Sequence, residues 1–463
     1  MQTRTEKDSL GERQIPADAY YGIQTHRALE NFPISGLKPK PAYVDATVHI
    51  KRAAARVNKE LGLLDPRKAD AIAAACDEIL GGGLRDWFVV DVYQAGAGTS
   101  HNMNANEVIA NRAIELLGGA KGEYSTIHPN DHVNMAQSTN DVCPTAIRIS
   151  AAALSRQLLK SLQGAAEAFS AKASEFDSIV KSGRTHLQDA VPIRLGQEFG
   201  AYATCIRKHS EAIRSAALLN QELGIGGTAV GTGINAHPRY RPLMVKELSA
   251  AVGIAFRMAD DYFEAMQSLR PFVNLSGAIR SLAQDLIRIA NDLRLLSSGP
   301  KTGLAEITLP SLQPGSSIMP GKVNPVMAEM LDMVCFQAIG CDTTVLMAAQ
   351  AGQLELNVMM PVVAYNLLHE IEILSNAVDV FTRFCVAGIQ ADPARCTAYA
   401  EASMSIVTVL NPHIGYAAAA EIAKEYLASG KSIRQIIGDR GLLNEEQLNR
   451  IFDLREMTEP GNK

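Results

Sequence analysis

Apolar residues recur at helical spacing in nearly every long segment of the chain, whereas strand-like alternation of apolar and polar residues is rare and short. This periodicity predicts a mostly α-helical protein. The longest amphipathic runs predict long helices that would pack side by side as a bundle. They cover residues 144–176, 196–223, 271–296, 326–349 and 362–387.

Shorter helical patterns on both sides of these runs predict further domains. Before the bundle, helices are expected at residues 43–61, 67–80 and 104–117, and after it at 416–428, 432–437 and 444–452. The predicted fold is therefore all-α and has three domains. These are an N-terminal mainly helical domain (1–140), a central five-helix bundle (141–392) and a small C-terminal helical domain (393–463).

Several of the long helices are apolar around much of their circumference, with runs of alanine such as residues 151–153. A helix of this kind must be buried on more than one side. Association of several copies of the chain is the simplest way to bury these faces, so we expect an oligomer.

Composition narrows the classes of function. The chain has 463 residues, 47% of them apolar and 20% charged, and its net charge of -5 argues against a nucleic-acid-binding protein. We find no apolar core of a signal peptide and no apolar run long enough to span a bilayer, so we expect a cytoplasmic protein. The seven cysteines lack Cys-x-x-Cys spacing, which indicates packed thiols rather than disulfides or a zinc site.

The loop at residues 315–325 combines two glycines and two prolines with hydroxyl, ammonium and amide side chains. Glycine and proline exclude a regular helix here, and an amphipathic run follows the loop directly. Lys322 and the helix N-terminus would both favour a bound anion. The alternative is a surface turn with a solvated Lys322, in which Asn324 caps the helix.

Other polar loops also precede predicted helices. Thr99 and Ser100 follow a glycine-rich stretch, and Ser138, Thr139 and Asn140 lie just before the longest helical run. Such residues commonly cap helices, but the same hydroxyls suit a carboxylate ligand. The glycine-rich stretch at 226–233 follows no predicted strand and does not fit a dinucleotide-binding loop.

Histidines occur in two of these connections. His128 and His132 are four residues apart, but no third ligand follows at a suitable spacing, so we predict helix capping and no metal. Thr185 and His186 lie in a connection between two long helices, where a single histidine is commonly structural.

The string Gly-Ser-Ser-Ile-Met-Pro-Gly-Lys-Val-Asn-Pro at 315–325 resembles the signature loop of the aspartase/fumarase superfamily, whose members release fumarate. The loops at 94–108, 137–141 and 183–189 resemble further blocks of the superfamily, in the family order. At Ser138-Thr139-Asn140 the chain is more similar to aspartases than to fumarases. The resemblance covers essentially the whole chain and implies deamination of L-aspartate to fumarate and ammonia.

The resemblance also implies roles for individual residues. Ser316 would be the base that takes a proton from C3 of the substrate, and Glu329 would hold His186 by a hydrogen bond. The carboxylate that gains charge as an aci-carboxylate would be bound by the hydroxyls of Thr99, Ser138, Thr139 and Ser317. The other carboxylate would be bound by Thr185, Lys322 and Asn324, and the amino group by Asn140 and His186. A secondary anion site is implied at His128, Asn130 and Asp131.

No cofactor and no metal are expected, and the family implies a homotetramer whose active sites are shared between subunits. The main alternative is fumarate hydratase, which shares the fold and the loop and differs in the leaving group. A helical protein that kept this fold without activity is a second alternative, because fold does not determine function. The intact Ser316, Lys322 and His186 argue against it.

Overall fold

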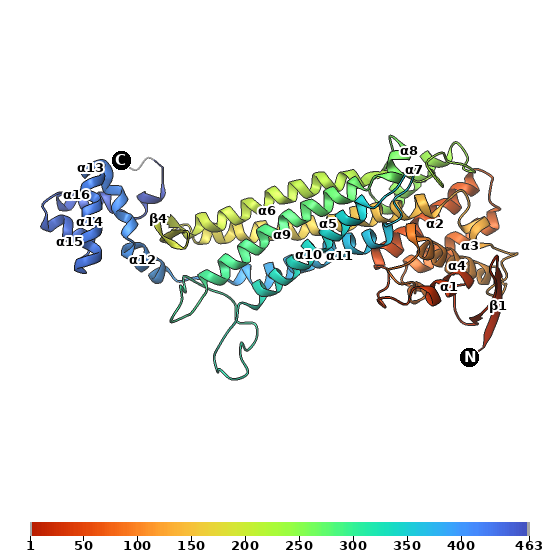
Figure 1. Cartoon of the computed structure of the whole chain (residues 1–463), viewed down its shortest axis with the longest axis horizontal. Coiled ribbons are helices and arrows are strands. Elements are labelled where there is room, and N and C mark those ends of the chain that lie inside the picture. The colour runs from red at the N-terminus through yellow and green to blue at the C-terminus, as the bar shows by residue number, and fades with distance from the viewer. Residues whose placement is uncertain (1, 461–463) are drawn as a thin grey trace. The chain divides into compact units, whose positions relative to one another are not determined.

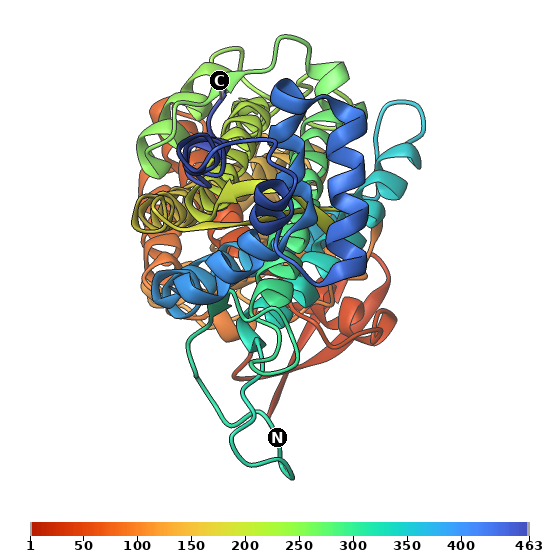
Figure 2. The same ribbon diagram turned by 90° about the vertical axis from the view of Figure 1, so that its left-hand side faces the viewer.

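A computed structural model describes residues 2–460 (Figures 1 and 2). Contacts between Cα atoms group them into two compact units, each built from separate stretches of the chain. Unit 1 contains residues up to Lys160, together with His209–Gln284 and Val334–Asn376, and unit 2 contains Ser161–Lys208, Asp285–Met333 and the remainder from Ala377. The division into three domains stays a prediction.

Long helices dominate the chain, and the prediction of an all-α fold is confirmed. The five longest are α5 (Thr139–Glu175), α6 (Leu195–Leu218), α9 (Arg270–Leu296), α10 (Val326–Gln350) and α11 (Met360–Phe384). Four of them begin within two residues of the predicted start. The fifth, α5, begins at Thr139 and contains Pro144, so the prediction that this helix starts at Pro144 is wrong. Proline removes one N–H donor near the start of a long helix, where many other bonds hold the structure.

Unit 1 is built around a helical layer that includes α2 (Pro41–Glu60), α3 (Pro66–Leu80) and α4 (Thr99–Leu116). α2 packs against α3 and α7 (Tyr240–Val252), and α3 packs against α4. Their shared core is formed by small and branched apolar side chains, with Ile72, Ala105 and Ile109 fully buried. The unit also contains α1 (Ile23–Asn31), α8 (Tyr262–Gln267), the antiparallel hairpin β1 (Thr3–Asp8) and β2 (Gly11–Pro16), and the short parallel pair β5 (Glu222–Leu223) and β6 (Arg257–Met258).

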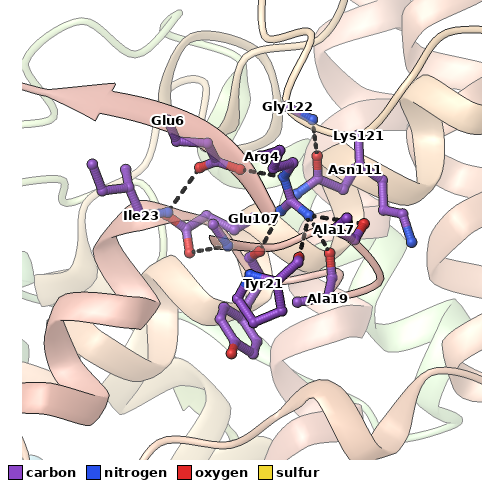
Figure 3. Close-up of polar contacts among 12 residues, drawn as sticks. Arg4, Glu6, Ala17, Ala19, Tyr21, Ile23, Glu107, Asn111, Lys121 and Gly122 are labelled. Atoms are coloured by element: carbon purple, nitrogen blue, oxygen red, sulfur yellow. Dashed lines mark hydrogen bonds and ion pairs between the residues drawn. The ribbon is translucent and has the colours of Figure 1, made fainter. Parts of the chain in front are cut away.

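Two buried carboxylates anchor the start of α1 (Figure 3). Glu107 accepts hydrogen bonds from the backbone N–H groups of Gly22 and Gln24 at 2.8 and 2.9 Å, and Glu6 accepts one from that of Ile23 at 2.8 Å. These carboxylates satisfy amides that a helix start leaves unpaired. Only glycine fits at position 22, because an added Cβ would lie 2.4 Å from the hydroxyl of Tyr124.

Unit 2 contains the antiparallel hairpin β3 (Val180–Thr185) and β4 (Gln188–Arg194) and a group of short C-terminal helices. β3 contacts α12 (Pro393–Ala402), and β4 contacts the 3-10 helix Met404–Leu410. The other helices are α13 (Asn411–Ile414), α14 (Tyr416–Ser429), α15 (Ile433–Asp439) and α16 (Glu445–Ile451). Leu410, Ile422 and Ile436 form the centre of their core. The short strands β7 (Ile307–Thr308) and β8 (Gln390–Ala391) pair in the same unit.

The prediction that the cysteines are mostly packed agrees with the structure, in which six of the seven are buried. The helix α10 bears on the prediction that no uninterrupted apolar run is long enough to span a bilayer, and Glu329, Asp332 and Asp342 interrupt its apolar residues. α10 is long and apolar enough to cross a bilayer by length and composition, a test that core helices of soluble proteins also pass. Two of its acidic side chains, Asp332 and Asp342, are buried and paired with Arg294 and Arg280 at 3.2 and 3.3 Å.

Candidate active site

The loop at residues 315–325 connects the end of a long irregular segment to α10 (Figures 1 and 2). Its two ends are tied together. The backbone N–H of Gly315 donates to the carbonyl of Lys322 at 2.7 Å, and the side-chain amide of Asn324 donates to the carbonyl of Gly315 at 2.7 Å. A Cβ at position 315 would lie 2.4 Å from the Lys322 carbonyl oxygen, so this close approach requires glycine. These hydrogen bonds within the loop therefore hold its two ends together.

Inside this loop the Ser316 hydroxyl accepts hydrogen bonds from the backbone N–H groups of Ile318 and Met319, at 3.2 and 2.9 Å. Amide donors favour the ionised form of an oxygen over its protonated form. Two such donors face the oxygen of Ser316 in this loop. Ser317 and Lys322 are exposed, and Lys322 makes no ion pair among the described residues, which leaves its ammonium free for a ligand carboxylate.

The β3–β4 hairpin places Thr185 and His186 at its exposed tip. The turn is formed by His186 and Leu187, with φ angles of 54° and 58°. Positive φ angles at both central residues are usual for a two-residue hairpin turn, although such turns favour glycine or asparagine. The expected contact between His186 and Glu329 is not made within the described chain. Glu329 lies in the first turn of α10.

A buried ion cluster holds strand β3 of this hairpin in place. Glu306 is fully buried and contacts Lys181 at 3.2 Å and Arg184 at 2.9 Å. Lys181, itself 2% exposed, also reaches Glu198 at 3.2 Å. Arg184 directly precedes Thr185, so the cluster fixes the strand that carries the candidate site residues.

In unit 1, Thr99 is the first residue of α4 and is exposed. Gly98 precedes it with a φ of +90°, and a Cβ there would lie 2.8 Å from the sulfur of Cys143. The Thr99 hydroxyl has only a weak contact with the Gly96 carbonyl, at 3.5 Å. It therefore stands at a helix N-terminus without capping the helix, which corrects the capping interpretation for this residue.

Ser138, Thr139 and Asn140 form the start of α5 and are all half-buried. Asn140 donates its side-chain N–H to the carbonyl of Ala229 at 2.8 Å. A carbonyl only accepts, so the amide oxygen of Asn140 points away from this contact and can accept from a ligand amino group. Ser138 accepts from the backbone N–H of Asn140 at 3.2 Å, so for Ser138 the capping interpretation holds.

Asp141 joins this block to the glycine-rich loop at 226–233, and sequence reasoning did not predict this connection. Its carboxylate accepts from the backbone N–H groups of Ser138, Gly226 and Thr228, each at 2.9 Å. Burial raises the pKa of Asp141 to about 6, although the three amides favour the ionised form. Its position beside the Ser-Thr-Asn run was the only signal in the sequence. Asp141 thus positions Ser138 and Asn140.

We expect the substitution Asp141→Asn to lower the free energy of unfolding by about 2 kcal/mol and to lower kcat/KM, because one side-chain N–H would then face backbone N–H groups. Urea unfolding and steady-state kinetics measure both. Asp65→Asn is the matched control. Asp65 accepts two backbone N–H bonds at the exposed start of α3, where asparagine caps equally well. An equal loss in the two variants would contradict the role of burial.

Of the expected secondary anion site, Asn130 and Asp131 lie in a short turn at Pro129–Val133, and His128 directly precedes it. The ring nitrogen Nδ1 of His128 accepts from the backbone N–H groups of Asn130 and Asp131, at 3.2 and 3.3 Å. His128 therefore caps this turn, as the capping interpretation predicted. The anion site itself stays a prediction, and Asn130 and Asp131 are exposed.

Comparison with known proteins places this arrangement in a family. Residues 11–340 match the family described as lyase, and residues 406–459 match the one described as fumarase C C-terminus. The chain belongs to the aspartase/fumarase family of lyases. This confirms the family and the enzyme class that the sequence resemblance predicted.

Members of this lyase family match the chain over nearly its whole length. The aspartate ammonia-lyase of Bacillus subtilis is 50% identical, over 99% of this chain and 96% of that protein, and that of Escherichia coli K12 is 48% identical, over 99% and 97%. Among solved structures, a fumarate lyase:delta crystallin from Brucella melitensis bound to cobalt has 51% identity and a TM-score of 0.96, covering 99% of this chain and 100% of that one. A class II fumarase from Schistosoma mansoni has 38% identity and a TM-score of 0.96, with the same coverage.

Proposed function

We propose that this lyase catalyses the reversible deamination of L-aspartate to fumarate and ammonia. The observation that carries the proposal is the identity of about half of all residues, over nearly the full length, to relatives named aspartate ammonia-lyase. The residues that the resemblance assigns to the substrate are all present, and the free oxygen of Asn140 suits an amino group.

In the proposed reaction Ser316 removes the proton from C3 of aspartate. The electron pair of that C–H bond moves into the adjacent carboxylate, which becomes an aci-carboxylate with a second negative charge. Hydroxyl donors at Thr99, Ser138, Thr139 and Ser317 stabilise this charge, and preorganised donors of this kind contribute about 3 to 4 kcal/mol each. The C2–N bond then breaks, the electron pair leaves with nitrogen, and the double bond of fumarate forms.

The remaining residues bind the carboxylate that stays unchanged and the amino group that leaves. Lys322, Asn324 and Thr185 hold the other carboxylate, and Asn140 and His186 hold the amino group that leaves. His186 is oriented by Glu329. Because these two residues are not in contact within one chain, the proposal requires a Glu329 carboxylate supplied by another subunit or a movement of the hairpin tip.

We further propose a homotetramer with shared active sites. α10 exposes large apolar side chains, with Phe336, Leu346 and Met347 at 58%, 46% and 57% exposure. A patch of this kind on a single helix favours burial by another subunit. In the loop at 315–325, Ile318 is 83% exposed, which supports closure of the loop over bound substrate.

The test is formation of fumarate, followed by its ultraviolet absorbance, from L-aspartate and separately from L-malate. We expect activity with aspartate and none with malate, because the Ser-Thr-Asn block presents an acceptor to the amino group. Activity with malate alone would instead make the protein a fumarate hydratase. A protein inactive with both substrates would contradict the proposed deamination and the hydratase alternative alike.

A further inference from the structure

A lysine with no assigned role lies behind the candidate site in unit 1. Lys51 is in α2 and is fully buried. Its ammonium donates three hydrogen bonds to side-chain amide oxygens, at 2.7 Å to Asn102, 2.8 Å to Asn134 and 2.9 Å to Gln137. It forms no ion pair among the described residues. A buried charge without a counter-ion is costly unless its hydrogen bonds are complete, so this arrangement requires an explanation.

Burial lowers the pKa of Lys51 to about 7, while the nearby Asp141 and Cys143 oppose that shift. The three oxygens favour the protonated form, because an ammonium has a donor for each of them and a neutral amine has only two. The site is therefore built for the cation.

The ammonium determines which way the amide of Asn102 faces. An ammonium has donors only, so the oxygen of Asn102 must face Lys51 and the nitrogen must face the opposite way. The nitrogen of Asn102 donates to the hydroxyl oxygen of Thr139 at 3.1 Å and to the side-chain oxygen of Asn134 at 3.3 Å. The direction of the hydrogen bond to Thr139 follows from the charge on Lys51.

The hydroxyl of Thr139 is polarised by this contact. One lone pair of its oxygen accepts from Asn102, and its proton has no acceptor among the described residues. Thr139 is half-buried at the start of α5, beside Ser138 and Asn140. A hydroxyl held in this way keeps its proton available to donate to a ligand carboxylate, which only accepts.

We propose that Lys51 and Asn102 are positioning residues that keep Thr139 a hydrogen-bond donor to the substrate carboxylate. This inference rests on the proposed function, in which Thr139 binds the carboxylate that gains charge. The hydrogen bond from Thr139 becomes stronger as the aci-carboxylate forms. A donor aimed at developing charge stabilises the transition state more than the ground state.

The substitution Asn102→Asp tests the direction of the chain of hydrogen bonds. It keeps an oxygen toward Lys51 and replaces the donor toward Thr139 and Asn134 by an acceptor, so the Thr139 proton would turn away from the substrate. We expect kcat/KM for aspartate to fall by about 100-fold or more. Thermal unfolding should change little, because the counter-ion that the buried ammonium gains offsets the lost hydrogen bond to Asn134.

Asn104→Asp is the matched control, because Asn104 is equally buried in α4 but contacts Trp87 and Val89 instead. We expect it to lower stability and to leave kcat/KM of the folded enzyme within about threefold. Asn102→Ala removes the donor without adding an acceptor, so the Thr139 proton stays free and the expected loss is about threefold to tenfold. A purely structural role predicts the reverse order, in which alanine is worse than the isosteric aspartate.

A double-mutant cycle decides whether the effect passes through Thr139. In a Thr139→Val background, Asn102→Asp should lower kcat/KM by less than about threefold. The inference would be overturned if the double variant lost kcat/KM by the product of the two single losses. Full activity in both Asn102 variants would also overturn it. If Asn102→Asp does not fold, the alanine variant alone decides, since full activity there would overturn it.

Different measurements test the proposed function and this inference. Activity of the unmodified protein with aspartate or malate tests the function, whereas the ratio between variants tests the positioning residues with either substrate. Calorimetric binding of fumarate gives the same ratio without turnover. We expect Asn102→Asp to weaken fumarate binding and Asn104→Asp not to weaken it.

Discussion

Replacing Ser316 by alanine should lower kcat for fumarate formation by a factor on the order of 10³ or more, because loss of a positioned base removes a proton-transfer step that side chains commonly accelerate by 10² to 10⁴. The fold should be unaffected. The Ser316 hydroxyl contacts only two backbone amides of its own loop, so the free energy of unfolding should change by less than about 1 kcal/mol.

Exchange of the C3 proton of aspartate with deuterated solvent separates this effect from weaker binding. Loss of the base should abolish exchange even at saturating aspartate. Ser317→Ala is the matched control, since Ser317 lies next in the same loop and is exposed. The Ser317→Ala variant should turn over more slowly because the aci-carboxylate is less stabilised, but exchange of the C3 proton should remain measurable. A Ser316→Ala enzyme that is folded, assembled and active would show that the base lies elsewhere.

Replacing Glu306 by glutamine should lower the free energy of unfolding by about 3 kcal/mol, because removing one partner from a buried ion cluster leaves uncompensated charge. Glu306 is fully buried and holds both Lys181 and Arg184. The same change should lower kcat/KM, because Arg184 adjoins Thr185 at the tip of the hairpin. Urea unfolding and steady-state kinetics measure the two effects.

Glu198→Gln provides the comparison for that result. Glu198 contacts the same Lys181 at 3.2 Å, but its side chain is 26% exposed. Water near this side chain can therefore compensate in part for the loss of its charge. We expect the free energy of unfolding to fall by about 1 kcal/mol or less. If the two variants lose equal stability, burial does not set the strength of this cluster.

The sequence by itself predicted the elements that depend on local periodicity and local chemistry. Four of the five long helices begin within two residues of the predicted start, since an amphipathic run is stable as a helix whichever partner covers its apolar face. The loop at 315–325 was equally readable, because its glycines and prolines exclude regular structure. The resemblance of the same loop to the aspartase/fumarase superfamily predicted the family, which the comparisons confirm.

Only the tertiary structure decided which buried charges meet. The hairpin that carries Thr185 and His186 has a two-residue turn with no glycine, so no turn signal marked it in the sequence. Glu306 pairs with Lys181 from more than a hundred positions away, and Lys51 reaches Asn102 from another helix. A single charged residue among apolar neighbours does not indicate its partner, because that partner depends on how distant segments cross. The periodicity of the chain therefore predicted its helices, and the packing of those helices selected the residues that hold its site.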